Sequence, residues 1–177
     1  MNSISVENLT KKYEHFTLDK LNLKIPEGSV VGLVGANGAG KTTLIKLLLG
    51  IIKKDSGNIN IINKEDIGIV LDDAFLPELL KINDINKIMK NIYKNWDELR
   101  FKEYLKKFNL TNNVTMKSLS KGMKKKLEIA TVLSHKPKLL ILDEPTSGLD
   151  PIVRGEVLDL FREFMEDDNH SILISSH

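Results

Sequence analysis

The chain has 177 residues, of which 41% are hydrophobic and 28% charged, and its formal net charge is +2. This length fits one domain with a core large enough for an enzyme, and the small net charge excludes a protein that binds polyanions through bulk electrostatics. The absence of cysteine excludes a disulfide framework and thiolate metal sites, and it favours a reducing compartment. The N-terminus lacks a signal-peptide pattern and no apolar run reaches membrane-spanning length, so we expect a cytoplasmic protein.

The first third of the chain has strand patterns that lead into one helix. Residues 3–9 and 16–25 alternate roughly apolar with polar side chains, which predicts half-exposed strands. Residues 29–34 form a β-branched run without alternation, as expected for a strand covered on both faces. A glycine-rich loop follows, and residues 43–49 predict a helix that ends at Gly50.

The rest of the chain alternates helices with buried strands. Apolar residues recur at helical spacing between 83 and 108, with a break at Trp96 and Asp97, which predicts an insertion of two helices. Residues 139–142 and 172–174 predict two further buried strands. This alternation indicates an α/β domain with a mainly parallel core sheet. The histidines in polar or loop contexts, which we expect to be exposed, are His15, His135 and His170.

Residues 35–42 match the pattern G-x-x-x-x-G-K-[ST] in full, between a predicted buried strand and a helix. Glycines let successive backbone N–H groups turn inward around phosphates, and the helix N-terminus adds a favourable dipole. We expect the Lys41 ammonium to reach the outer phosphates and the Thr42 hydroxyl to ligate Mg²⁺. A glycine-rich turn without a ligand is the alternative. The predicted nucleotide-binding residues here are Gly35, Ala36, Asn37, Gly38, Ala39, Gly40, Lys41, Thr42 and Thr43.

Two acidic residues follow the predicted strand at 139–142. A phosphate loop of this kind needs a carboxylate that holds magnesium and a group that positions or activates water. Asp143 leaves the strand where it could face the metal, and Glu144, one residue further, could polarise the attacking water. The alternative is ordinary surface chemistry, since an acidic pair after an apolar run is common.

A second pattern, N-K-E-D at residues 63–66, matches the N-K-x-D motif with which GTPases bind guanine. It lies too soon after the phosphate loop and before the Asp143 strand, and no D-x-x-G precedes it. We therefore interpret this run as a polar turn.

The strand that ends at Asp143 continues as DEPTSGLDP over residues 143–151, and LSKGM occupies residues 119–123. With the phosphate loop, this order resembles the nucleotide-binding domain of an ATP-binding cassette (ABC) transporter over nearly the whole chain. LSKGM and VLDDAF look most similar to single-cassette bacterial subunits, often drug or peptide exporters. The resemblance implies a P-loop NTPase of the α/β class with a mainly parallel core sheet, an antiparallel β subdomain at the N-terminus and an inserted α-helical subdomain.

The resemblance also implies a domain organisation. We expect one ABC-type ATP-binding domain over residues 1–177, with the helical insertion at about 78–120. Members of this family usually continue beyond the position of His177 with a further helix and strand. A C-terminal truncation is therefore an open alternative.

Several single residues acquire roles through this resemblance. Tyr13 would stack on adenine, and a half-buried tyrosine at a strand end is the alternative. Asp72 stands where the family usually has glutamine and would offer oxygen to Mg²⁺, with Asp73 as the alternative. His177 corresponds to the switch histidine that contacts the γ-phosphate. Asp150 matches the aspartate of the loop that crosses the dimer interface.

The family resemblance implies that two such domains pair head to tail, either as a homodimer or with a similar cassette. Both ATP sites are then shared through one two-fold axis. Ser120 is predicted to be the N-cap of a helix, and Ser120 and the Gly122 amide would bind the γ-phosphate held by the other copy.

A basic run surrounds this predicted helix start. Lys121 stands where the family commonly has glycine and could add charge near the phosphate, whereas Lys124 and Lys125 are expected on a solvated face. A nucleic-acid patch is disfavoured, because the lysines lack interleaved aromatic residues. We expect no direct nucleic-acid partner.

The function implied by the resemblance is that of a transport ATPase that uses ATP and Mg²⁺. Glu144, Lys41 and His177 would carry hydrolysis, and the insertion with the loop at Asp72 would contact an integral membrane permease. The protein would be peripheral on the inner face of the cell membrane. Two rivals stay open: a soluble ATPase that acts on ribosomes or DNA, and a regulatory nucleotide-binding module without turnover.

Overall fold

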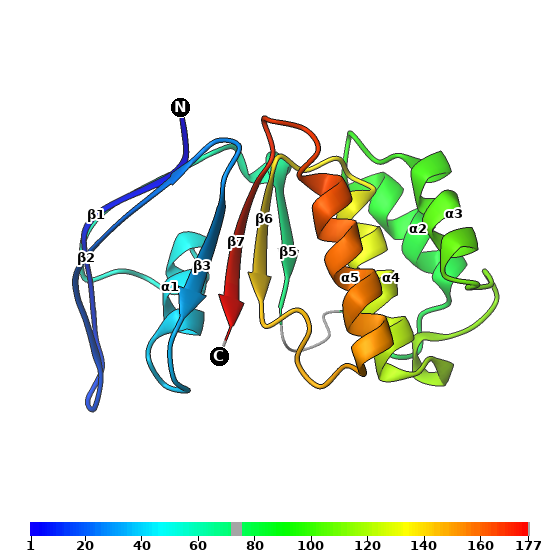
Figure 1. Cartoon of the computed structure of the whole chain (residues 1–177), viewed down its shortest axis with the longest axis horizontal. Helices are drawn as coiled ribbons and strands as arrows, with labels where there is room; N and C mark the ends of the chain where they lie inside the picture. Colours follow the sequence, from blue (N-terminus) through cyan, green and yellow to red (C-terminus); the bar gives the residue numbers. More distant parts are fainter. Residues whose placement is uncertain (72–75, 177) are drawn as a thin grey trace.

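The structure is a computed structural model that describes residues 1–71 and 76–176. Two sheets lie side by side, and helices cover the larger sheet (Figure 1). The predicted site residues Asp72, Asp73 and His177 lie outside the described residues. Among the residues that are described, none of the helices has the length and apolar character needed to cross a bilayer.

The smaller sheet is antiparallel and has the strand order β2-β1-β4. Its strands are β1 (Asn2–Lys12), β2 (Thr17–Pro26) and β4 (Ser56–Ile61). β1 and β2 confirm the strands predicted from alternation. β4 was not predicted, although Ile59 and Ile61 alternate with polar residues and pack inward. The N-K-E-D run forms a short 3-10 turn, Lys64–Asp66, capped by Asn63, which confirms a polar turn.

The larger sheet is parallel in all its pairings and has the order β3-β7-β6-β5. Its strands are β3 (Val30–Val34), β7 (Ser171–Ser176), β6 (Leu139–Asp143) and β5 (Ile67–Val70). Parallel strands end at the same edge of a sheet, so the loops after β3 and β6 meet there. This arrangement confirms the α/β fold with a parallel core.

β3 is an edge strand, and the prediction that it is covered on both faces is wrong. Val30 is 57% exposed and Val34 is 79% exposed. Within the described part of the chain, β3 pairs with β7 alone, so one side of the strand has no neighbour. A β-branched run predicts a strand, but its place in the sheet depends on which strands pair with it.

β6 is buried on both sides because helices cover both faces of the parallel sheet. Leu139 and Ile141 belong to a core with α1 (Lys41–Leu48) and the antiparallel sheet, whereas Leu140 and Leu142 belong to a second core. The second core includes α4 (Lys121–Leu133) and α5 (Pro151–Phe164). Side chains alternate between the faces of a strand, so burial on both faces requires the continuous apolar run.

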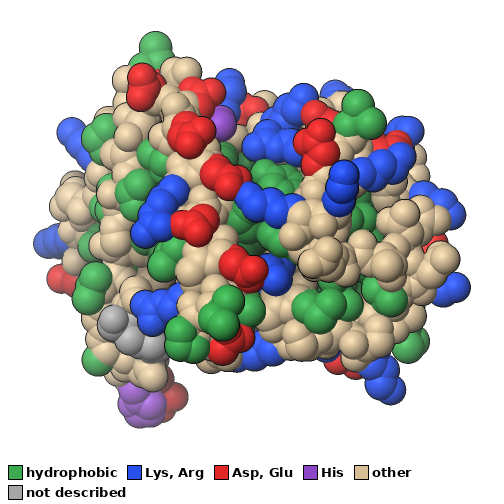
Figure 2. Space-filling view, turned by 45° about the vertical axis from the view of Figure 1, so that its right-hand side comes forward, with side chains coloured by type: hydrophobic (Ala, Val, Ile, Leu, Met, Phe, Trp, Pro, Cys, Tyr) green, Lys and Arg blue, Asp and Glu red, His purple; other side chains and the backbone are tan. Residues whose placement is uncertain are grey.

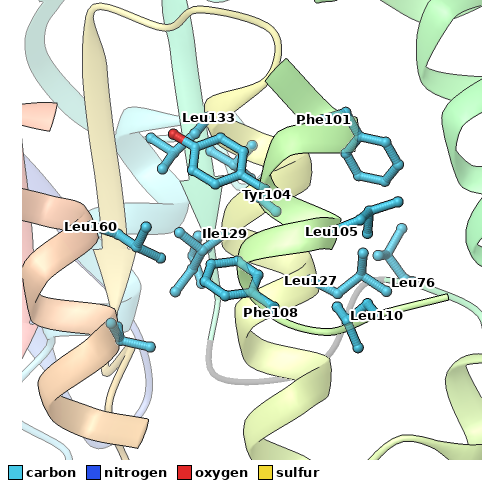
Figure 3. Close-up of a cluster of buried hydrophobic side chains, with 14 of the residues drawn as sticks. Leu76, Phe101, Tyr104, Leu105, Phe108, Leu110, Leu127, Ile129, Leu133 and Leu160 are labelled. Atoms are coloured by element: carbon cyan, nitrogen blue, oxygen red, sulfur yellow. The ribbon is translucent and has the colours of Figure 1, made fainter. Parts of the chain in front are cut away.

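The helical part consists mainly of α2 (Ile82–Ile92) and α3 (Glu98–Lys107), where two helices were predicted. Asp97 caps α3 by accepting a hydrogen bond from the Arg100 amide at 2.9 Å, which explains the break in the pattern. Phe101 and Leu105 of α3 lie in the same buried cluster as Leu127 of α4 (Figure 3). α4, which begins within the LSKGM run and is called the signature helix here, therefore packs on the sheet and on the inserted helices together.

His135 is buried, so the prediction of an exposed side chain is wrong. Its exposed fraction is 1%, its Nε2 lies 3.2 Å from the Ile67 carbonyl oxygen, and its ring stacks on Tyr93 at 4.1 Å. His170 is also partly buried, with its ring 4.2 Å from Phe164. His15 is exposed as predicted. Burial disfavours the charged imidazole and lowers the pKa of His135.

A pH-dependent loss of stability follows from His135. Its folded-state pKa lies below the ordinary 6.5, so the unfolded chain binds a proton more readily as the pH falls. We expect the free energy of unfolding to decrease from about pH 6.5 downward, with a slope of at most about 1.4 kcal/mol per pH unit. Urea denaturation of wild type and His135→Gln should show a shallower dependence in the variant. Equal slopes would contradict this assignment, and His15→Gln is the exposed control.

Candidate functional site

The glycine-rich loop joins β3 to α1 at the carboxyl edge of the parallel sheet. Gly38 and Gly40 have φ values of 81° and 94°, which non-glycine residues adopt only with strain. Gly40 is the N-cap of α1, and no side chain caps that helix end. The first amides of α1 therefore remain available to an anion, as a phosphate site requires.

Lys41 folds back over this loop. Its Nζ donates hydrogen bonds to the carbonyl oxygens of Gly35 at 2.5 Å and Ala36 at 3.2 Å. The ammonium therefore lies beside the loop and the N-terminus of α1, where it adds positive charge to the helix dipole.

Asp143 is the centre of a hydrogen-bond network that joins three elements. The Thr42 hydroxyl of α1 donates to Asp143 Oδ2 at 2.9 Å, and the Ser175 hydroxyl of β7 donates to Oδ1 at 2.5 Å. The carboxylate is only 4% exposed. Ser175 was not among the predicted site residues, since only the pairing of β6 with β7 brings it to Asp143.

Glu144 follows Asp143 in an unusual backbone conformation. Its φ is 48°, in the left-handed region, which costs a residue with a side chain about 1 kcal/mol or more. Its amide donates to the Ser175 hydroxyl at 3.0 Å. Ser175 therefore holds both Asp143 and the turn at Glu144, and backbone strain of this kind is concentrated at functional sites.

Tyr13 directly follows β1, and its exposed fraction is 47%. The Lys11 ammonium lies 5.5 Å from the centroid of its ring, and the same ammonium contacts Asp55 at 3.0 Å. The hydrogen bond from the Lys12 amide, and then that from the Lys11 ammonium, lower the pKa of Asp55. The Lys11 ammonium, itself held by Asp55, therefore lies over the Tyr13 ring, and about half of Tyr13 is accessible to solvent.

The N-termini of α4 and α5 lie next to each other. Ser120 caps α4, since its Oγ accepts from the Met123 amide at 3.2 Å, and Asp150 caps α5 with Pro151 at the first helical position. The Ser120 cap confirms the prediction, whereas the capping role of Asp150 was not predicted. A methyl group on Gly122 would lie 3.0 Å from Val153, so these helix ends are in close contact.

The predicted site residues therefore fall into two groups on one edge of the molecule. The phosphate loop, Asp143 and Glu144 form the first group, and Ser120, Gly122 and Asp150 form the second. Figure 1 shows both groups at its lower edge, where β3 and β6 end and where α4 and α5 begin.

The basic run on α4 is largely paired with carboxylates. Lys124 contacts Glu78 at 3.3 Å, and Lys126 contacts Glu156 at 2.9 Å. Lys125 is only 7% exposed, so the prediction of a solvated side chain is wrong. On the face drawn in Figure 2, basic and acidic side chains are interspersed, which does not favour a polyanion surface.

Lys125 forms a buried ion pair that reaches the end of β5. Its ammonium contacts Glu128 at 3.1 Å and donates to the Leu71 carbonyl oxygen at 3.0 Å. Burial raises the pKa of Glu128, and the Lys125 charge opposes that change. This pair links the signature helix to the last described residue before position 72.

An apolar cavity of about 240 Å³ lies between the edge of the sheet and the helical part. It does not include the phosphate loop. Its lining residues are Ile69, Leu71, Met89, Tyr93, Thr131, Val132 and His135. The Nδ1 atom of His135 is buried and has no hydrogen-bond partner among the described residues.

Comparison with known proteins agrees with this arrangement. A family model described as "ABC transporter" matches residues 18–147, which include the phosphate loop, the Ser120 helix start and Asp143. The chain belongs to this family.

Curated ABC transporter relatives match almost all of the chain. It is 38% identical to the lantibiotic transport ATP-binding protein SrtF of Streptococcus pyogenes, over 98% of this chain and 80% of the relative. It is 39% identical to the bacitracin transport ATP-binding protein BcrA of Bacillus licheniformis, over 98% and 61%. The chain is 33% identical to YdbJ of Bacillus subtilis, an uncharacterized ABC transporter ATP-binding protein, over 98% of this chain and 61% of the relative. The chain therefore spans less than two thirds of YdbJ and BcrA.

Solved ABC structures have the same fold. The chain superposes with a TM-score of 0.79 and 33% identity on cbiO1 of Clostridium perfringens, which is part of the transporter complex cbiONQ; the match covers 99% of this chain and 78% of that one. The ATP-binding subunit of another ABC transporter gives a TM-score of 0.83 and 26% identity, over 98% and 79%.

The buried pair of this ABC chain allows a stability test. Replacing Lys125 by Met leaves the Glu128 carboxylate, 2% exposed, without its cation. We expect Lys125→Met to lower the free energy of unfolding by about 3–5 kcal/mol. The double variant Lys125→Met/Glu128→Leu should recover most of this loss in urea denaturation.

The control is Lys107→Met, which removes an exposed ion pair with Glu163. It should change stability by at most about 1 kcal/mol. A double variant as unstable as Lys125→Met would contradict the ion-pair explanation.

Proposed function

We propose that this chain is the ATP-binding and ATP-hydrolysing subunit of an ABC transporter that powers a separate membrane permease. The observation that carries the proposal is the Asp143 carboxylate, which binds Thr42 of the phosphate loop at 2.9 Å with Glu144 beside it in a strained turn. Two relatives are named for lantibiotic and bacitracin transport, and we propose export as the direction for this chain.

ATP would bind with its phosphates in the loop at residues 35–43. The uncapped N-terminus of α1 and the Lys41 ammonium offer amides and positive charge to the β- and γ-phosphates. Tyr13, half-exposed and held by Lys11, would stack on adenine.

The oxygen atoms near the loop suit Mg²⁺. Thr42 and Asp143 supply a hydroxyl and a carboxylate within hydrogen-bond distance of each other. No cluster of three acidic or histidine side chains able to hold a metal exists in residues 1–71 and 76–176. Mg²⁺ keeps several waters and binds one or two carboxylates with substrate phosphates, and Asp143 would be such a carboxylate. Bound there, the ion would neutralise charge on the phosphate oxygens. Asp72 is proposed as a further ligand.

Glu144 would orient or deprotonate the attacking water. The Glu144 amide donates to the Ser175 hydroxyl, and the same hydroxyl donates to Asp143. Ser175 therefore holds the Glu144 backbone in a fixed position relative to the Asp143 carboxylate. Lys41 would stabilise the negative charge that develops on the γ-phosphate. His177 is proposed to contact the same phosphate.

A head-to-tail dimer would complete the site. Ser120 and Gly122 lie at the N-terminus of α4, and Asp150 lies beside them at the start of α5. Their position on the same edge as the phosphate loop supports pairing with a second copy or a similar cassette (Figure 1). Lys121 would add charge to this surface.

The permease would bind at the boundary between the sheet and the helical part. We propose that residues 78–120 form the helical subdomain within a single domain of residues 1–177. The apolar cavity beside β5 and α2 supports this location, because it offers Ile69 and Met89 to a partner segment. The chain would then be cytoplasmic and peripheral on the inner face of the membrane.

Replacing Glu144 by Gln tests the assignment. The amide keeps the size of the side chain but cannot act as a base, so we expect hydrolysis to fall by about 10²-fold or more while ATP binding persists. ATP should then hold the variant as a dimer in size-exclusion chromatography. Glu163→Gln, at an exposed ion pair, is the matched control and should retain wild-type activity. Wild-type turnover in Glu144→Gln would show that Glu144 is not the hydrolytic carboxylate.

A further inference from the structure

The hairpin between β1 and β2 touches the phosphate loop through Phe16. A methyl group built on Gly40 would lie 2.5 Å from Phe16 Cζ, and 3.3 Å and 3.4 Å from the adjacent ring carbons. The tip of the ring therefore rests on the backbone of Gly40, which is the N-cap of α1. An aromatic ring on the antiparallel sheet thus contacts the place where phosphate is proposed to bind.

Phe16 and Tyr13 form a fixed aromatic pair at this end of the sheet. The Tyr13 amide donates to the Phe16 carbonyl oxygen at 2.8 Å, and the ring centroids are 6.5 Å apart with an interplanar angle of 33°. Lys11 lies over the Tyr13 ring and is held by Asp55. Backbone hydrogen bonding therefore sets the spacing of the two rings before any ligand binds.

The Phe16 ring is not explained by packing in the cores. Phe16 is only partly buried, and neither Phe16 nor Tyr13 belongs to the two hydrophobic clusters. Leu18, two residues further along the chain on β2, does pack against one of them. The tip of the Phe16 ring therefore contacts a glycine of the phosphate loop and not a hydrophobic core.

We propose that Phe16 is a nucleotide-binding residue that contacts the ribose and adjoining base of ATP, between the phosphate loop and Tyr13. The inference rests on the proposed function. A triphosphate at the N-terminus of α1 must extend its nucleoside toward Tyr13 if that ring stacks on adenine. Phe16 touches Gly40 at one end of this path and neighbours Tyr13 at the other. Its ring would cover the apolar face of the sugar and exclude water from the Gly40 amide.

A rival explanation is that Phe16 only stiffens the phosphate loop. The two explanations differ for a ligand that has phosphates but no nucleoside. If Phe16 contacts the nucleoside, its replacement weakens the binding of ATP alone. If Phe16 stiffens the loop, its replacement weakens the binding of every ligand that the loop holds.

The test measures the dissociation constants of ATP and of inorganic tripolyphosphate by isothermal titration calorimetry, in the presence of Mg²⁺. We expect Phe16→Ala to weaken ATP binding by about five- to tenfold and to leave tripolyphosphate unchanged. Phe16→Leu should lose less, because it retains part of the apolar surface. His15→Ala, at a 90% exposed neighbour in the same hairpin, is the matched control and should bind both ligands as wild type does.

Two results would overturn the role of Phe16 and leave the proposed function intact. One is unchanged ATP affinity in Phe16→Ala, and the other is an equal loss of affinity for ATP and tripolyphosphate. Thermal unfolding of each variant separates these results from misfolding, and Phe16→Leu keeps the comparison available if Phe16→Ala is unstable. A wild-type protein that does not bind ATP would overturn the proposed function and this inference with it.

Discussion

The site depends on one buried carboxylate. Asp143 accepts hydrogen bonds from Thr42 at the start of α1 and from Ser175 on β7, so it joins the phosphate loop to the centre of the parallel sheet. A carboxylate that is 4% exposed is costly unless its oxygens are satisfied, and here each oxygen has a hydroxyl donor. The same hydroxyl of Ser175 accepts a hydrogen bond from the Glu144 amide. One side chain therefore holds both the Asp143 carboxylate and the Glu144 backbone.

The second organising constraint is the position of α4. This helix contacts both β5 and α3, and its Leu127 lies in the same buried cluster as Leu105 of α3 (Figure 3). Its buried Lys125 reaches the end of β5, whereas His135, after its C-terminus, contacts the beginning of β5 at Ile67. α4 and the residues that follow it therefore contact the chain at both ends of β5.

Local patterns were sufficient for much of the fold and for the first group of site residues. The glycines at 38 and 40, the apolar run of β6 and the cap Ser120 each have a short-range physical cause that can be read along the chain. Ser175 could not be predicted in this way. Its role comes from pairing of β6 with β7 across more than 30 residues, and a serine in a strand has no signal of its own.

What the sequence by itself determined is many of the helices and strands, the phosphate loop and the family resemblance, because these depend on residue type and on spacing within one or two elements. Only the tertiary structure decided that β3 lies at an edge, that Lys125 and His135 are buried, and that Phe16 touches Gly40. Lysine and histidine are usually solvated, and a strand pattern is the same at an edge and at a centre. Their positions depend on which distant surfaces pack together, and that information is spread over the whole chain.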